Sequence, residues 1–213
     1  SIPQKFLGLF VALWNLIKMI GVKIKDEAVD IWNTFVLGDW KTKVSFLVMG
    51  FGNLARGQIL RSLLFLVFEI VFIGYMIVAG GYWLSMLPSL GKVGPTETYD
   101  YIFDTYVTTY NDNSFKILLY GVLTIFFIIA FVYTWRVNVK QNKIAEQILK
   151  SGKKLKSDKD DLRSMVDDKF HATLLALPLT GITIFTVMPI VFMILVAFTN
   201  YDGAHDGYYS NLF

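Results

Sequence analysis

Few side chains in this sequence have the type and spacing that chemistry requires, and Glu69 stands first among them. It is the only carboxylate inside a long apolar run, where a charge costs several kcal/mol unless it is paired or protonated. We therefore expect Glu69 to face other helices and not lipid. A proton or substrate relay would use such a carboxylate, whereas a hydrogen bond to a neighbouring helix or to Arg61 is the structural interpretation, which we favour.

Other candidates for catalysis or cofactor binding are weak. The chain has no cysteine, which excludes disulfides and thiolate metal sites, and its two histidines, His171 and His205, are too far apart in sequence to suggest metal ligands. Gly50, Gly52 and Gly57 match no nucleotide-binding fingerprint, because no Lys-Ser/Thr pair accompanies them. The sequence predicts no catalytic residue, no cofactor and no metal ligand, and we expect the chain not to be an enzyme.

Three apolar runs must position these residues. Of the 213 residues, 54% are hydrophobic, a share that a soluble domain rarely carries in continuous runs. The runs cover residues 62–84, 117–135 and 172–198, and at ~1.5 Å per residue each is long enough for a hydrocarbon core of about 30 Å. The sequence therefore predicts an all-α integral membrane protein with three transmembrane helices plus interfacial or cytoplasmic amphipathic helices. The net charge of +3 is too small to indicate nucleic-acid binding.

The third run contains two prolines, Pro178 and Pro189, and each removes one helical N–H donor. We expect nearby hydroxyls to satisfy the carbonyls that the prolines leave free. The threonines within reach are Thr180, Thr183 and Thr186. The run then changes abruptly to polar turn-forming residues with one aromatic, which predicts the outer end of the helix. These residues are Asn200, Tyr201 and Asp202.

Residues 1–61 are predicted to form an amphipathic region in the cytoplasm or at the membrane interface. Residues 1–20 are interrupted by Asn15 and Lys18, so they are too short to span and fit a helix that lies flat on the membrane. Residues 21–37 are amphipathic, and Gly38 and Asp39 end their helix. A surface-lying or bundle-packed helix is the favoured interpretation, and a target segment for a partner protein is the alternative.

The glycine-rich segment 45–61 predicts a short re-entrant or interfacial hairpin, because glycines allow close packing. Its two arginines, Arg56 and Arg61, are expected to reach lipid headgroups. The start of the chain, before the apolar residues that begin at Phe6, does not read as a cleavable signal peptide.

Residues 62–136 are predicted to form a helical hairpin of two spans, 62–84 and 117–135, joined by an outer loop at 85–115. Apolar and aromatic residues of the loop fall at helical spacing, which predicts an amphipathic helix along the outer face. They are Ile102, Phe103, Tyr106, Val107 and Tyr110. Tyrosines could stack on sugar rings, but interfacial tyrosines are common for ordinary amphipathic reasons. Asn113 or Ser114 is the expected N-cap of the second span.

Residues 137–170 are predicted to be a charged cytoplasmic linker of two short helices. Ile144 and Ile148 mark the first helix, and Ser157 with Asp160 forms a capping box for the second. Apolar residues of the second helix are Leu162, Met165 and Val166. The lysines are interleaved with acids and adjoin the spans, so a cytoplasmic loop is a better interpretation than a nucleic-acid patch.

The basic residues predict the orientation. Eight precede the first span and ten lie in residues 136–169, whereas Lys92 and the boundary residue Lys116 are the only ones in the outer loop. The positive-inside rule places the N-terminus and the linker in the cytoplasm of a multi-pass plasma-membrane protein.

The third run, ALPLTGITIFTVMPIVFMILVAFTNYD, resembles the opening transmembrane segment of the permease core in maltose and maltodextrin ABC importers, the MalF-like subunits. The matching residues are Pro178, Phe185, Pro189, Ala197, Phe198, Thr199, Asn200 and Tyr201. Upstream, GFGNLARGQILRSLLFLVFE and DNSFKILLYGVLTIFF resemble the N-terminal regions of Gram-positive members, which carry extra spans before the core.

The resemblance implies that residues 171–213 hold the first helix of the permease core and the start of the following extracellular loop. It also implies a second permease subunit, a cytoplasmic ATPase dimer, an extracellular sugar-binding protein and the lipid bilayer as partners. Family members continue with further helices that hold the sugar-binding residues, so we expect this chain to be the N-terminal portion. The alternative is a small three-span membrane scaffold or assembly protein without transport activity of its own.

Overall fold

The computed structural model describes residues 2–94, 96–109, 112–158, 160, 163 and 170–199. The chain forms two compact units, and we treat each separately. Unit 1 combines residues 1–66 with 135–155, and unit 2 combines residues 67–134 with 156–213. The predicted sites Asn200, Tyr201 and Asp202 lie outside the described residues, as do the apolar residues predicted for the second linker helix.

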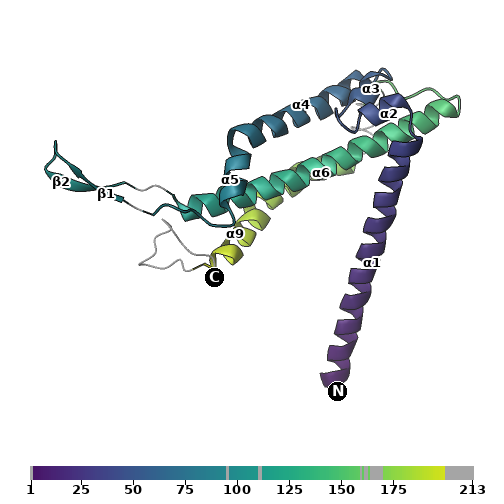
Figure 1. Ribbon diagram of the computed structural model, residues 1–213. Coiled ribbons are helices and arrows are strands. Elements are labelled where there is room, and N and C mark those ends of the chain that lie inside the picture. Colours follow the sequence, from purple (N-terminus) through teal and green to yellow (C-terminus); the bar gives the residue numbers. More distant parts are fainter. Residues whose placement is uncertain are drawn as a thin grey trace. The chain divides into compact units, whose positions relative to one another are not determined.

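Unit 1 gathers short elements around the C-terminal part of one long helix (Figure 1). It contains α1 (Ile2–Leu37), α2 (Trp40–Val44) and α3 (Phe51–Leu54). The beginning of α4 (Ile59–Tyr75) and the end of α6 (Ser114–Lys150) complete it. The single helix α1 replaces the two successive helices predicted for residues 1–37. Gly21 does not interrupt it, since a helix tolerates an isolated glycine at a cost of about 1 kcal/mol.

The end of α1 agrees with the prediction. The helix stops at Leu37, and Asp39 becomes the N-cap of α2, because its Oδ1 accepts a hydrogen bond from the Thr42 N–H at 2.8 Å. Residues 45–58 then fold as turns around the four-residue helix α3. Gly50 and Gly57 both adopt φ +84°, a left-handed conformation that favours glycine. The depth of this segment in a membrane stays a prediction.

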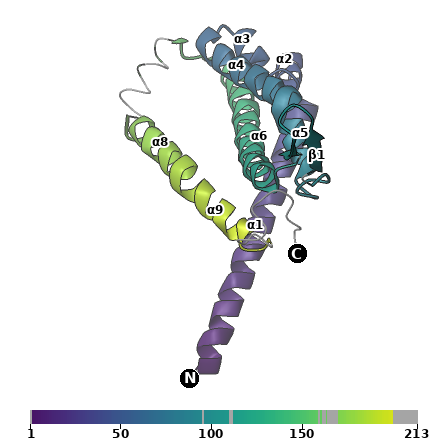
Figure 2. The same ribbon diagram turned by 90° about the vertical axis from the view of Figure 1, so that its left-hand side faces the viewer.

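Unit 2 holds most of the apolar helical sequence. It contains the rest of α4, the π-helical turn η1 (Met76–Gly80), α5 (Gly81–Met86) and the N-terminal part of α6. The third apolar run forms α8 (Phe170–Ile182), η2 (Thr183–Val187) and α9 (Met188–Val196), which make one continuous rod in Figure 2. Among the described residues, three helices are long and apolar enough to cross a membrane. They are Ile59–Met86, Ser114–Lys150 and Leu174–Val196. The predicted fold class is confirmed.

The second of these helices is longer than the sequence predicted. It begins at its expected cap, where the Lys116 N–H donates to Asn113 Oδ1 at 2.8 Å. It then runs past Trp135 without a break, so the separate helix predicted around Ile144 is part of α6. No glycine or proline lies between residues 122 and 150, and the helix ends just before Gly152, which has φ +75°. The predicted capping box follows: the Ser157 N–H donates to Asp160 Oδ2, and the Asp160 N–H donates to Ser157 Oγ.

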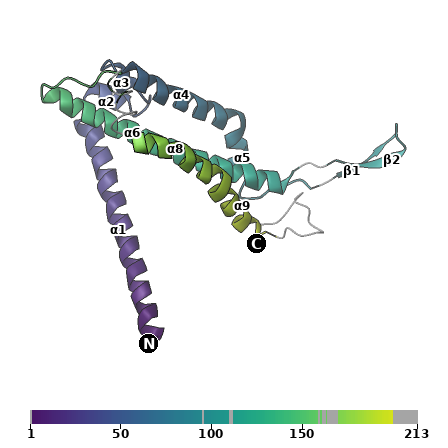
Figure 3. The ribbon, with the colours of Figure 1, turned by 180° about the vertical axis from the view of Figure 1, so that it is seen from behind.

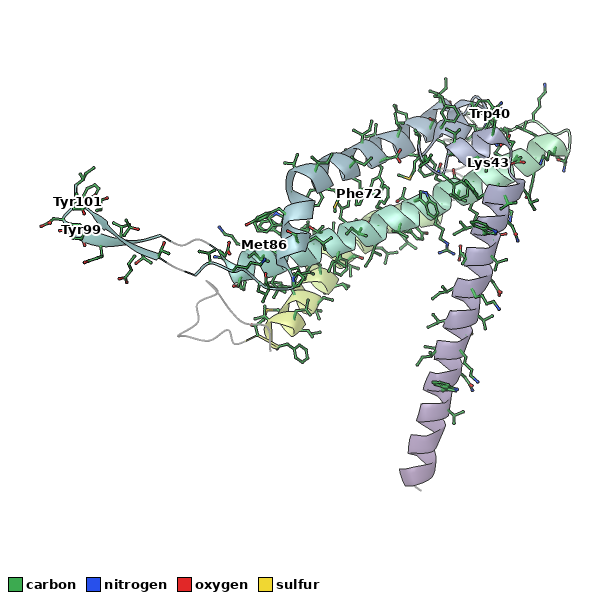
Figure 4. The ribbon with its side chains drawn as sticks, in the orientation of Figure 1. Trp40, Lys43, Phe72, Met86, Tyr99 and Tyr101 are labelled. Carbon is green, nitrogen blue, oxygen red and sulfur yellow. The ribbon has the colours of Figure 1, made fainter. Side chains whose placement is uncertain are left out.

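The amphipathic helix predicted in the outer loop is wrong. Residues 96–109 form an antiparallel hairpin of β1 (Thr96–Asp100) and β2 (Thr105–Thr109), with Tyr99 opposite Tyr106. Threonine, tyrosine and valine favour extended backbone, and Asp100 Oδ1 accepts the Ile102 N–H at 2.8 Å in the turn. The spacing of the five apolar residues is compatible with a helix, but the threonines between them are β-branched and favour strands. Figure 4 shows Tyr99 and Tyr101 on this hairpin.

Aromatic side chains pack α4 on α6 within unit 2. The Phe72 ring stacks on Phe131 with centroids 3.8 Å apart, and Phe127 contacts Phe68, Phe72 and Tyr75 edge-on. Figure 4 shows Phe72 between the two helices. A second apolar cluster joins the loop after α5 and the start of α6 to α9. Its buried members are Leu90, Ile117, Leu118, Val122 and Phe192.

Thr180 and Thr183 of the third span do not donate to the carbonyls that the prolines leave free, contrary to the prediction. The carbonyls left free by Pro178 and Pro189 belong to Leu174 and Phe185, four residues earlier. The Thr180 hydroxyl donates instead to the Ala176 carbonyl at 2.7 Å, and the Thr183 hydroxyl donates to the Leu179 carbonyl at 2.9 Å. The π-helical turn η2 precedes Pro189, and its Thr183 carbonyl accepts the Met188 N–H. A π-turn is a common local adjustment of a helix next to a proline.

Candidate functional site

Arg56 is the centre of a buried polar network in unit 1. Its side chain is 0% exposed. The guanidinium donates to Asn142 Oδ1 at 2.7 Å, to Thr42 Oγ1 at 2.7 Å and to Asp39 Oδ1 at 2.8 Å, and it reaches the Gly52 carbonyl at 3.2 Å. The prediction that Arg56 reaches lipid headgroups is therefore wrong, because acceptors from three neighbouring elements surround it. The same prediction for Arg61 stays a prediction.

One face of α6 supplies the other half of the network. Asn138, Asn142 and Glu146 follow one another at intervals of four residues, so they line one side of the helix, and all three are buried. Asn138 Oδ1 accepts the Gly50 N–H at 3.0 Å, while its Nδ2 donates to the Ser45 carbonyl at 2.8 Å. Glu146 Oε2 accepts the Thr42 hydroxyl at 2.9 Å and the Asp39 N–H at 3.1 Å.

Close packing accompanies this hydrogen bonding. A Cβ atom on Gly52 would lie 2.0 Å from Asn142 Oδ1, so the glycine is needed where the backbone approaches α6. The Trp135 indole N–H donates to the Phe46 carbonyl at 3.0 Å, and the two rings also meet edge-on. Gly52 thus allows the close approach that was predicted for the glycines of residues 45–61, but to the polar face of α6.

The chemistry of the network is that of an anchor. Each of the two carboxylates, Asp39 and Glu146, accepts hydrogen bonds, and Arg56 lies against Asp39. Among the described residues, no group of three or more histidine, cysteine or acidic side chains could hold a metal ion. Buried polar groups with matched partners specify one arrangement of the elements that carry them. The sequence signal was the four-residue spacing of Asn138, Asn142 and Glu146, in a segment interpreted as a charged cytoplasmic linker.

Asp39 is a titratable group of the network, and its pKa is shifted in the folded protein. Burial by itself raises the pKa of the Asp39 carboxyl, but hydrogen bonds from Thr42 and the charge and hydrogen bond of Arg56 hold this pKa below its ordinary value of 3.8. The folded state thus favours the carboxylate. Its contribution to stability is present above pH 3.8 and is lost as pH falls through the lowered folded pKa.

We expect the variant Asp39→Asn to be less stable than the wild type at pH 7, and the difference to shrink below about pH 4. Asparagine can still cap α2, but its side chain is neutral and cannot form the ion pair that Asp39 makes with Arg56. Thermal unfolding of both proteins in detergent, followed by tryptophan fluorescence at pH 7 and at pH 3.5, measures this. A difference that stays constant between the two pH values would show that the Asp39 charge contributes nothing.

The spans of unit 2 contain the predicted intramembrane carboxylate. Glu69 lies on α4, its exposed fraction is 9%, and it has an interaction partner in the structure. Six residues further along α4, the Tyr75 hydroxyl and the Thr124 hydroxyl of α6 are 2.7 Å apart and hydrogen-bonded. The burial of Glu69 is what its charge requires, and its role stays a prediction.

An apolar groove of about 720 Å³ lies beside this hydrogen bond. Its walls come from α4, α6, α8, η2 and α9, and no charged side chain lines it. Thr180 and Thr183 line the groove, but both hydroxyls donate to carbonyls of their own helix. The predicted site residues are not brought together here: Pro178 lies in α8 and Pro189 in α9, and neither they nor Glu69 line the groove.

Comparison with known proteins finds a distant relative. The chain is similar to the "Maltodextrin transport system permease protein MalC" of two strains of Streptococcus pneumoniae, with 26% identity over 167 residues. The aligned region is 78% of this chain and 35% of the relative, so the chain spans about a third of the length of the curated relatives it matches. No protein-family profile matches the chain, and no solved structure matches it. The similarity and the three apolar helices of the described residues together indicate a multi-pass membrane protein.

Proposed function

We propose that this chain is the N-terminal portion of a permease subunit of an ATP-binding-cassette importer for malto-oligosaccharides or a related sugar. The observation that carries the proposal is the similarity to a maltodextrin permease over 78% of the chain. The three described helices that are long and apolar enough to cross a membrane are in keeping with it. The role of the chain is to scaffold the translocation pathway. ATP hydrolysis resides in a separate subunit, in keeping with the lack of a nucleotide-binding fingerprint in these 213 residues.

The N-terminus and the linker at 137–170 lie in the cytoplasm in this proposal, and the loop at 85–115 lies outside. Two observations support it. Basic residues gather before the first span and after the second. In addition, the polar network of unit 1 joins residues 39–56 to residues 138–146, on either side of the two spans in sequence. Such contacts require both segments to lie on the same side of the membrane.

The partners follow from the proposed machine. They are a second permease subunit, a cytoplasmic ATPase dimer, an extracellular sugar-binding protein and the surrounding lipid bilayer. The apolar groove of unit 2, at the depth of the spans, is a surface of the kind that neighbouring transmembrane helices or lipid chains cover. The β1–β2 hairpin is on the outer side, and its exposed tip residues Tyr101, Ile102 and Phe103 lie there.

The test is uptake of radiolabelled maltotriose by cells in which the gene is disrupted. We expect uptake to fall to background, to return with a plasmid copy of the full-length gene, and glucose uptake to stay unchanged. Unchanged maltotriose uptake would refute the proposal.

A scaffold or assembly protein would also reduce uptake, so a second measurement is needed. The full-length protein, purified from membranes in mild detergent, should bring an ATPase subunit with it and support ATP-dependent maltotriose uptake in liposomes. A liposome system that transports equally well without this protein would favour the scaffold.

The same assay separates the two interpretations of Glu69. We expect Glu69→Gln to retain most of the uptake, because a buried amide can keep hydrogen bonds made by a carboxyl. Uptake rates are compared at equal membrane abundance, measured by immunoblot. Loss of uptake with normal abundance would instead assign Glu69 to a relay.

A further inference from the structure

One face of α1 is held against α6 by charged side chains. Glu27 forms an ion pair with Arg136, and Asp30 forms one with Lys143. Thr34, one turn beyond Asp30, is buried. At 100° per residue these three side chains lie within one narrow arc of the helix. The polar arc of residues 27–34 is therefore turned toward the rest of unit 1.

Most of the opposite face of α1 has no neighbour in unit 1, although near the end of the helix the Phe35 ring contacts the Phe46 ring edge-on. Figures 1 and 3 show that no other element of this unit lies beside most of the helix. Trp14 and Trp32 are 18 residues, or five full turns, apart, so they point in the same direction. They are 55% and 66% exposed. Further exposed apolar side chains accompany them along the helix: Ile17, Ile24, Val29, Phe35 and Val36. This arrangement is the reverse of that of a helix on a water-soluble protein, which turns its apolar face inward.

The composition of the outward face fits a lipid interface. Tryptophan gathers at the level of lipid headgroups, and lysine extends its charge toward water from the same depth. Lys18 and Lys25 share the face with the tryptophans, and the Lys18 ammonium lies 5.7 Å from the centre of the Trp14 ring. Among the described residues, α1 does not qualify as a membrane span, whereas α4 does, and α4 begins about 20 residues after α1 ends.

We propose that α1 lies parallel to the membrane in the headgroup region, with the face that carries Trp14 and Trp32 toward the acyl chains. The ion pairs Glu27–Arg136 and Asp30–Lys143 fix its rotation about its own axis. The occupant of the unpartnered face is thus the lipid bilayer and not a protein. This inference goes beyond the proposed function, since it concerns the contacts of α1 with lipid and holds whatever solute the protein carries.

Spin labels on single cysteines test the orientation in the full-length protein reconstituted into lipid nanodiscs. These 213 residues contain no cysteine, so a label placed among them has no competitor there. The matched pair is Ala28→Cys and Asp26→Cys. Both positions are exposed and two residues apart, but they lie on opposite sides of α1. We expect the label at position 28 to be relaxed more by oxygen, which dissolves in lipid, and the label at position 26 more by a water-soluble nickel chelate.

Two outcomes would overturn the proposal. Equal and strong relaxation by the nickel reagent at both positions would mean that α1 is surrounded by water. Protection of position 28 from both reagents would mean that a protein covers this face. Because the readout is the surroundings of a label, failure here is independent of failure in the uptake assay.

The contribution of the ion pairs is tested by charge exchange. We expect Glu27→Arg to reduce the contrast between positions 26 and 28, and the double variant Glu27→Arg, Arg136→Glu to restore it. A contrast that is unchanged in the single variant would show that the pairs do not set the rotation of α1.

Discussion

Gly50→Ala is expected to destabilise unit 1 far more than Gly57→Ala, although the two glycines have the same φ of +84°. A Cβ atom on Gly57 would meet nothing within 4 Å. Gly57→Ala should therefore be destabilised only by the left-handed backbone conformation, which costs an alanine about 1 kcal/mol. A Cβ on Gly50 would lie 2.5 Å from the Ser62 carbonyl oxygen and 2.9 Å from the Ser62 Cα. Relief of that clash requires backbone movement at the start of α4, which adds about 1–3 kcal/mol.

Thermal unfolding in detergent, with protease cleavage within residues 45–58 as a local readout, measures the two variants side by side. We expect rapid cleavage only in Gly50→Ala, because the Gly50 N–H also donates to Asn138 Oδ1 and that bond would be displaced. Equal stability of the two variants would contradict the close packing of Gly50 on Ser62.

Arg56→Met is expected to cost about 1–3 kcal/mol, the range for buried polar groups that lose their partner. The range for a fully buried ion pair does not apply, because the Asp39 side chain is 34% exposed. The variant would leave Asp39, Thr42 and Asn142 without the donor that now joins them. Arg56→Lys keeps the charge but cannot reach all of these acceptors from one ammonium, so we expect an intermediate loss.

Lys43→Met is the matched control, since Lys43 is an exposed cation on α2 (Figure 4). Its expected effect is within about 0.5 kcal/mol. Unfolding temperatures and the yield of detergent-soluble protein measure all three variants. If Arg56→Met were as stable as Lys43→Met, the network would not hold residues 39–56 on α6.

The sequence was sufficient to predict the three spans, because length and lack of charge are the only properties needed to cross a hydrocarbon core. The cap at Asn113, the end of α1 before Gly38 and the Ser157–Asp160 capping box were also readable, since each depends on bonds between residues within a few positions. The outer hairpin was missed because apolar periodicity over so short a segment as residues 102–110 fits both a helix and a pair of strands.

The polar network could not be read from the sequence for a different reason. Arg56 and Asn142 are 86 positions apart, and nothing local indicates that an arginine before one span will meet an asparagine after the next. A basic residue near a span usually faces lipid headgroups, and that prior gave the wrong environment for Arg56. The four-residue spacing of Asn138, Asn142 and Glu146 indicates a polar face of α6, but nothing in the sequence indicates that this face packs against residues 39–56.

The sequence distance within this network also sets an order of events during synthesis. Asn138, which accepts the Gly50 N–H, is made 88 residues after Gly50, and at 5–20 residues per second this is a wait of roughly 4–18 s. During that interval both apolar runs must enter the membrane, while Arg56 and Asp39 have no α6 to cover them. The β1–β2 hairpin, by contrast, pairs residues at most 13 positions apart and can form as soon as it is made. Unit 1 is therefore closed only after the second span has returned the chain to the side on which it began.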